Sequence, residues 1–215
     1  MELTLFILEI IGTVAFAVSG AIAGTNRNMD ILGITIMAVV TATGGGAIRD
    51  ITLGVTPPTV FVKPIYLLIA LLTCVIFFIG AEIWRRCTQM DNKVPRSIVA
   101  QAINVSDAIG LGVFTVSGAA IAMAMGYGNN FVLVLFVGST TGVGGGIMRD
   151  LFTGQIPSVF VRHIYALASL IGAATLFGLQ FILDQKVAML LCTALVVVIR
   201  ILSSRFHLSL PKVKR

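Results

Sequence analysis

The chain has 215 residues, of which 57% are hydrophobic and 11% are charged, and its mean hydropathy is +1.02. A soluble domain usually carries about 25% charged residues, so this composition excludes a soluble globular fold and predicts an integral membrane protein. The formal net charge of +6 comes from basic residues in short loops, which suit the anionic headgroups of a lipid bilayer. This distribution argues against a nucleic-acid partner.

Seven apolar stretches follow one another along the chain. A helix needs about 20 mainly apolar residues to cross the ~30 Å hydrocarbon core of a bilayer, and most of the stretches meet that length. The pattern predicts an all-α protein with seven transmembrane helices. The start, Met1-Glu2, lacks the positive segment of a signal peptide, so we expect the first stretch to be a retained helix. The stretches cover residues 4–24, 31–48, 65–83, 103–125, 131–148, 164–183 and 187–202.

Basic residues predict the orientation of these helices. If successive loops alternate sides, twelve Lys and Arg residues fall on one side, and three (Arg49, Lys63 and Lys186) fall on the other. The richer side is normally cytoplasmic. We therefore expect a multi-pass protein of the cell (inner) membrane with its N-terminus outside and its C-terminus in the cytoplasm.

The chain contains an internal duplication. The segment TATGGGAIRD at 41–50 returns as TGVGGGIMRD at 141–150, and AFAVSG at 15–20 returns as VFTVSG at 113–118. Each copy holds three spans, an odd number, so the second copy enters the membrane from the opposite side and the pair forms an inverted repeat. The predicted organisation is a first three-helix repeat at 1–84, a cytoplasmic connector at 85–102, a second, inverted repeat at 103–185, and a seventh helix with a basic cytoplasmic tail at 186–215.

Two runs of three glycines stand near the ends of the second and fifth spans. Each glycine costs about 1 kcal/mol in a helix relative to alanine, and irregular backbone within a bilayer must be buried in protein or face water. We expect both helices to break or kink there beside a conduction path, where freed carbonyls could coordinate a cation. The alternative is close packing of helices on small residues. These glycines are Gly44, Gly45, Gly46, Gly144, Gly145 and Gly146.

Two acidic residues within the spans are repeat partners. Glu9 and Asp107 each lie seven residues before a repeated phenylalanine. A carboxylate in a span is costly and normally points into the bundle or a wet cavity, so these acids would concentrate cations at the two ends of one route. They could equally neutralise Arg49 and Arg149 across the bundle, and both roles can hold together.

Further polar residues recur at matched positions. Arg49 and Asp50 follow the first glycine run, and Arg149 and Asp150 follow the second. These arginines are candidates for salt bridges or for a positive constriction, and exposed arginines would favour anions. The serines of the second repeated segment, Ser19 and Ser117, are polar pore candidates, although a hydroxyl in a membrane helix usually bonds the carbonyl four residues earlier.

Nothing in the sequence predicts catalysis, a metal site or a bound cofactor. Cys74, Cys87 and Cys192 have no paired spacing, so we interpret them as small hydrophobic residues rather than ligands or disulfide partners. The glycine runs lack the Lys-Ser/Thr of a phosphate-binding loop. We expect a protein that is not an enzyme.

The doubled GGGxxRD motif in a 3+3+1 inverted repeat resembles the prokaryotic TRIC family, the trimeric intracellular cation channels, a family also labelled as a putative glycine transporter domain. The resemblance covers residues 5–204. It implies a homotrimer with a pore inside each protomer, potassium or sodium as the permeant ion, and second and fifth helices kinked at their glycines. We infer no obligatory protein partner. The Lys-Glu-Val tripeptide by which animal members bind phosphoinositides is absent here, so that lipid dependence is not expected.

We therefore expect a passive channel for potassium and sodium, with a path that runs between the two copies past both glycine runs. The alternative is a secondary transporter of a small solute such as glycine or another amino acid. Inverted repeats with broken helices are typical of such carriers, and exposed helix N-termini would bind a substrate carboxylate. A membrane scaffold without transport is a second alternative.

Overall fold

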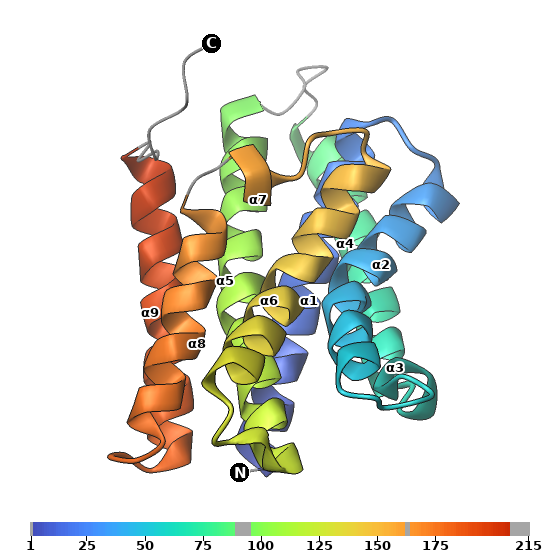
Figure 1. The fold of residues 1–215 in the computed structure, drawn as a ribbon. Helices are drawn as coiled ribbons and strands as arrows, with labels where there is room; N and C mark the ends of the chain where they lie inside the picture. Colours follow the sequence, from blue (N-terminus) through green and yellow to red (C-terminus); the bar gives the residue numbers. More distant parts are fainter. Residues whose placement is uncertain (1, 89–95, 162–163, 207–215) are drawn as a thin grey trace.

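Most of the described residues are helical. The computed structural model describes residues 2–88, 96–161 and 164–206, and every regular element in these ranges is a helix (Figure 1). Within these ranges, six helices are long and apolar enough to cross a membrane, and a shorter apolar helix, α8, has 15 residues. Two four-residue helices, α3 and α7, follow α2 and α6. The bounds are α1 Glu2–Asn26, α2 Ile31–Thr52, α3 Thr59–Val62, α4 Ile65–Thr88, α5 Arg96–Ala122 with a π-helical turn Met123–Tyr127, α6 Phe131–Phe152, α7 Ser158–Val161, α8 Tyr165–Leu179 and α9 Gln185–Arg205.

Matched residues begin and end α2 and α6. Asp30 Oδ1 accepts from the backbone N–H of Gly33 at 2.7 Å, and Asn130 Oδ1 accepts from that of Leu133 at 3.0 Å. Such caps satisfy amides that have no partner within the helix. Past the other end of each helix lies a glycine with positive φ, Gly54 or Gly154, a conformation that favours glycine and closes the helix.

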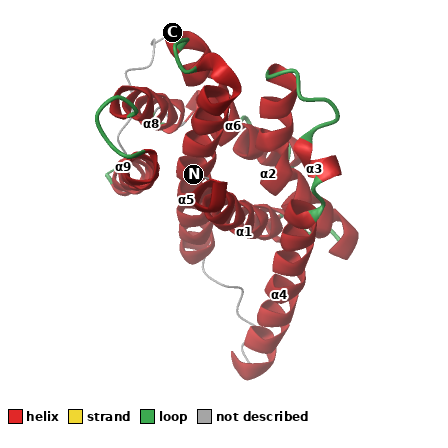
Figure 2. Cartoon of the chain, turned by 90° about the horizontal axis from the view of Figure 1, so that it is seen from below, coloured by secondary structure: helices red, strands yellow, loops and turns green. Residues whose placement is uncertain are grey.

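Four helices form the centre of the bundle. α1, α2, α5 and α6 pack on one another, α4 packs on α1 and α2, and α8 and α9 pack on α5 from the other side. Figure 2 shows this division, with α4 far from α8 and α9. In Figure 1 α1 rises from the lower end, where α3 lies, whereas α5 descends from the upper end, where α7 lies. The corresponding helices of the two halves therefore run in opposite directions.

The outer faces of the helices are apolar. Large hydrophobic side chains such as Leu32, Ile76, Phe160 and Ile182 are well exposed, whereas the arginines of both repeated motifs are buried. Extended apolar exposure would drive aggregation in water and is suited to lipid. The chain is a multi-pass membrane protein.

Two expected boundaries differ from the structure. Residues 96–102, expected in the connector, form the first part of α5, because α5 begins at Arg96 and α4 reaches Thr88. The span expected at 164–183 is helical from Tyr165 to Leu179, after which turns lead into α9.

The predicted breaks at the glycine runs are wrong. α2 continues through Gly44–Gly46 and α6 continues through Gly144–Gly146 without leaving α-helical geometry. The prediction of freed carbonyls is therefore wrong as well, because a continuous helix uses its carbonyls in its own hydrogen bonds. A bend of either helix axis at these glycines stays a prediction.

Candidate functional site

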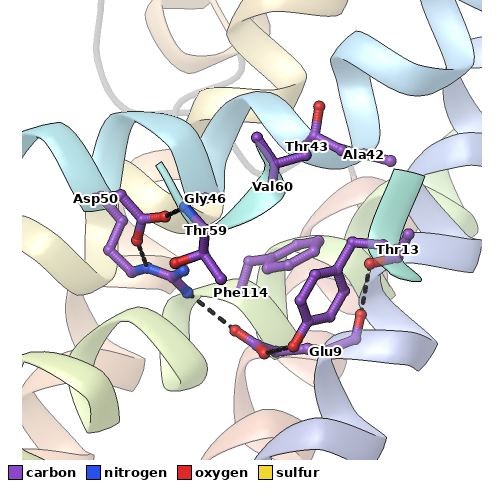
Figure 3. Close-up of a pocket in the computed structure, with 11 residues that line it drawn as sticks. Glu9, Thr13, Ala42, Thr43, Gly46, Asp50, Thr59, Val60 and Phe114 are labelled. Atoms are coloured by element: carbon purple, nitrogen blue, oxygen red, sulfur yellow. Dashed lines mark hydrogen bonds and ion pairs between the residues drawn. The ribbon is translucent and has the colours of Figure 1, made fainter. Parts of the chain in front are cut away.

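A first cluster of charged side chains lies where α1, α2 and α4 meet (Figure 3). Arg49 donates from Nη1 to Glu9 Oε1 at 2.9 Å and from Nε to Asp50 Oδ1 at 2.8 Å. The Tyr66 hydroxyl donates to Glu9 Oε2 at 2.5 Å, and the backbone N–H of Thr59 in α3 donates to Asp50 Oδ2 at 2.6 Å. The three charged side chains are buried. With both carboxylates ionised, this first cluster carries one excess negative charge.

A second cluster repeats this arrangement at the other end of the bundle. Arg149 donates from Nη1 to Asp107 Oδ1 at 2.6 Å and from Nε to Asp150 Oδ1 at 3.0 Å. The Tyr165 hydroxyl donates to Asp107 Oδ1 at 3.1 Å, and the backbone N–H of Ser158 in α7 donates to Asp150 Oδ2 at 2.7 Å. Each half of the molecule thus builds one guanidinium–dicarboxylate group from its own helices.

The second cluster also includes a residue that has no equivalent in the first. Arg200 of α9 lies with Nη2 3.7 Å from Asp107 Oδ2, and its guanidinium carbon lies 4.5 Å from the centre of the Tyr165 ring. The Arg200 side chain is buried. The second cluster therefore has two carboxylates and two guanidinium groups.

Each cluster includes a serine from the opposite half. Ser117 donates to Glu9 Oε1 at 2.8 Å, and Ser19 Oγ accepts from Arg149 Nη1 at 2.6 Å. Both serines are fully buried. Hydrogen bonds to charged groups are stronger than those between neutral groups, so these two contacts fix the register of α1 against α5 and α6.

The glycine runs lie at the crossing of α2 and α6. A methyl group on Gly45 would overlap the carbonyl oxygen of Thr141, and one on Gly145 would overlap that of Thr41. Close approach of two backbones requires glycine at such positions. The packing alternative thus accounts for this part of the motif, since contacts across the crossing compensate the low helix propensity.

Cavities adjoin both clusters. Beside the first cluster lies a cavity of about 30 Å³, whose lining includes Glu9, Gly46, Arg49 and Phe114. At the opposite end a cavity of about 520 Å³ reaches Arg149 and Asp150 and has a polar rim formed by residues such as Asn26, Arg27 and Gln155. We call the larger cavity the vestibule, and the smaller one has room for about one water-sized occupant.

Two buried phenyl rings pack on each other near the first cluster. Phe16 and Phe114 are stacked with ring centroids 5.3 Å apart. Phe114 borders the cavity of the first cluster, while Phe16 lies where a methyl group on Gly145 would meet it at 2.9 Å. Both rings are buried, so this part of the bundle is tightly packed.

Comparisons with known proteins agree with this architecture. A family model described as "Glycine transporter" matches residues 6–82 and again residues 104–180. The chain is 37% identical over 209 residues to the UPF0126 membrane protein YvgT of Bacillus subtilis, and the match covers 95% of this chain and 94% of that protein. A crystal structure of a prokaryotic TRIC channel in 0.5 M KCl superposes with a TM-score of 0.86 at 31% identity and covers 98% of this chain and 100% of that one.

A TRIC orthologue from Rhodobacter sphaeroides superposes with a TM-score of 0.84 at 32% identity, covering 97% of this chain and 100% of that one. The chain belongs to the prokaryotic TRIC family. The resemblance drawn from the doubled GGGxxRD motif is therefore confirmed.

In this TRIC family member the structure brings the candidate acids and arginines together. Glu9, Arg49 and Asp50 share the first cluster, and Asp107, Arg149 and Asp150 share the second. The arginines are thus held by carboxylates within their own half. Ser117 donates to the opposite half instead of to a carbonyl of its own helix, and Ser19 accepts a hydrogen bond from the opposite half.

The six glycines of the two runs lie in three different environments. Gly44, Gly45, Gly144 and Gly145 face the helix crossing, where added methyl groups would meet Met148, Thr141, the Gly45 backbone or Thr41. Gly146 lies against the Tyr165 hydroxyl. Gly46 is different, because a methyl group there would have Arg49 Nη2 as its nearest neighbour at 3.9 Å, and Gly46 borders the small cavity.

Sequence reasoning missed three members of the TRIC site. The hydroxyls of Tyr66 and Tyr165 both bind the acids, and Tyr165 is only 1% exposed. Their recurrence in VFVKPIY and VFVRHIY was the available signal. Arg200 has no repeat partner, and a charge within an apolar stretch was its only signal.

The described cysteine side chains belong to neither of the two clusters of charged residues. Cys74 and Cys192 are buried free thiols, as expected, while the Cys87 side chain lies outside the described residues. Across the described ranges, no group of three or more His, Cys, Asp and Glu side chains is placed to hold a metal ion.

Proposed function

We propose that this protein is a passive channel for monovalent cations, potassium and sodium, with a conduction route inside each protomer. The similarity to solved TRIC channels over nearly the whole chain supports cation conduction. The route runs from the vestibule past Arg149, through the crossing of α2 and α6, to the cavity beside Glu9. We further propose a homotrimer in the inner membrane, with two inverted repeats, the N-terminus outside and the C-terminus in the cytoplasm.

The observation that carries this proposal is the pairing of two arginines with carboxylates. Arg49 and Arg149 lie on the route, and each donates to two carboxylates. A bare guanidinium in a pore attracts anions and repels cations, whereas one held by two carboxylates leaves the site neutral or negative. The first cluster, with its excess carboxylate, favours a cation.

The same contacts disfavour the transporter alternative. A carrier for an amino acid needs a cationic group or a free helix N-terminus for the substrate carboxylate. Here Glu9 and Asp107 already occupy the guanidinium groups, and α2 and α6 are unbroken at their glycines. The family label "Glycine transporter" therefore has no matching feature in either cluster.

Purified protein in planar bilayers tests the proposal. We expect stepwise unitary currents, and under a KCl gradient a reversal potential near the potassium equilibrium value. A reversal potential near the chloride value would contradict cation conduction. Saturable uptake of radiolabelled glycine into proteoliposomes, without unitary currents, would instead establish the carrier.

A further inference from the structure

α9 breaks the correspondence between the two halves of the molecule. It follows the second half and packs on α5 and α8. Figure 2 shows α9 beside α8 at one edge of the bundle, with α4 at a distance on the other side. One result is a difference in burial: Tyr165 is covered and only 1% exposed, whereas its counterpart Tyr66 is half-buried.

α9 also brings an additional charge to the second cluster. Arg200 is buried, lies 3.7 Å from Asp107 and stacks on the Tyr165 ring. Its Nε has no hydrogen-bond partner among the described residues. A buried guanidinium with an unpaired donor is costly to stability, so packing alone gives no reason to place an arginine here.

The two clusters consequently differ in net charge. In the first cluster, Glu9 and Asp50 both pair with Arg49, which is the cation paired with them among the described residues. The second has Asp107 and Asp150 against Arg149 and Arg200. With all carboxylates ionised, the first cluster carries one negative charge and the second is neutral. Such a difference matters in a buried site, where the low dielectric strengthens every charge.

We propose that Arg200 makes the two ends of the conduction route electrostatically unequal, so that the first cluster is a resident site for a permeant monovalent cation and the second is not. This inference rests on the proposed cation conduction. The cavity beside Glu9, at about 30 Å³, has room for one water-sized occupant, and the Glu9 carboxylate and the Thr13 side chain border it. Arg200 acts through Asp107, so it is a positioning residue rather than a group that touches the ion.

Ion positions in crystals test the inference without any measurement of current. Rubidium replaces potassium in the crystals, and its anomalous scattering locates it. In the wild type we expect a rubidium peak beside Glu9 and none beside Asp107. In Arg200→Met a second peak appears beside Asp107, since focusing by one uncompensated charge raises local cation concentration by about tenfold or more. A wild-type peak beside Asp107, or the lack of one beside Glu9, overturns the inference even if no variant folds.

Single-channel recordings provide the second readout. With channels inserted in one orientation in symmetrical KCl, the wild type should rectify, and Arg200→Met should bring the ratio of inward to outward current toward unity. Arg200→Lys keeps the charge and should retain the wild-type ratio, which a purely structural role would not predict. Arg205→Gln removes an exposed charge from the same helix and serves as the control. An unchanged ratio in Arg200→Met contradicts the inference.

The two readouts separate this inference from the proposed function. Wild-type protein that gives no unitary current fails as a channel, whatever its rubidium positions. Wild-type protein that conducts cations but binds rubidium equally at both clusters remains a channel and refutes the role of Arg200.

Discussion

Ser117 donates a hydrogen bond to Glu9 Oε1 at 2.8 Å, although the two residues are 108 positions apart and belong to opposite halves of the chain. The same oxygen accepts from Arg49 at 2.9 Å. The ion pair of the first half is thus completed by a hydroxyl of the second half. The reciprocal contact, from Arg149 to Ser19, makes the ion pair of the second half equally dependent on the first.

Ser117→Ala should therefore destabilise the protein. The substitution leaves a buried carboxylate oxygen with one donor fewer, and a hydrogen bond to a charged group contributes about 1.5–3 kcal/mol. Thermal unfolding of the detergent-solubilised protein measures the loss. Ser97→Ala, at an exposed position near the start of α5, is the control, and equal melting temperatures for the two variants would contradict the prediction.

Gly45→Ala and Gly46→Ala should have different effects on stability. A methyl group at position 45 overlaps the Thr141 carbonyl, whereas at position 46 the nearest neighbour is Arg49 Nη2 at 3.9 Å. Overpacking costs about 1–3 kcal/mol, which lowers the melting temperature of a chain of this size by about 2–12 °C. Gly46→Ala should stay level or rise, because alanine has the higher helix propensity. If both variants melt alike, the glycines are not needed for the crossing of α2 and α6.

Asp107→Asn should be more damaging than Glu9→Gln. Asp107 faces two guanidinium groups, Arg149 and Arg200, whereas Glu9 faces one. Loss of one partner of a buried ion pair costs about 3–5 kcal/mol, and Asp107→Asn leaves the second cluster with one excess positive charge. We expect a lower melting temperature and a larger fall in potassium flux into liposomes than for Glu9→Gln. The reverse order would show that Arg200 does not depend on Asp107.

Phe114→Ala should increase conduction while it weakens the fold. The ring borders the cavity beside Glu9 and stacks on Phe16, so its removal widens the centre of the route. Truncation of a buried phenylalanine costs about 3–5 kcal/mol. Unitary conductance and melting temperature should move in opposite directions, while Phe160→Ala, at an exposed site, should change neither. A lower conductance in Phe114→Ala would place the route elsewhere.

The charged groups could be predicted from the sequence because they recur in both copies of the repeat. Glu9 and Asp107, like Arg49 and Arg149, stand out because a buried charge is costly and each one recurs in the second copy. Their spacing left two roles open, an attraction for cations and mutual neutralisation. Only the positions of α1 against α2, and of α5 against α6, show that the carboxylates and guanidiniums lie within hydrogen-bond distance.

The glycine runs show where such reasoning stops. Helix propensity is a property of one helix, and by that measure three glycines in a row predict a break. The Thr141 carbonyl that faces Gly45 belongs to a helix far along the chain, and its approach has no local signature. Arg200 was missed for another reason. It has no counterpart in the other copy, so comparison of the two repeats did not single it out.

The two aspartates of the GGGxxRD motifs have a further consequence. Asp50 holds Arg49 through Oδ1 and the first amide of α3 through Oδ2, and Asp150 does the same for Arg149 and α7. Each carboxylate therefore joins a buried guanidinium to the surface loop that carries the short helix. If either arginine moved and carried its aspartate with it, the short helix bonded to that aspartate would move too. A conformational change inside the bundle would then be coupled to the loop at the surface.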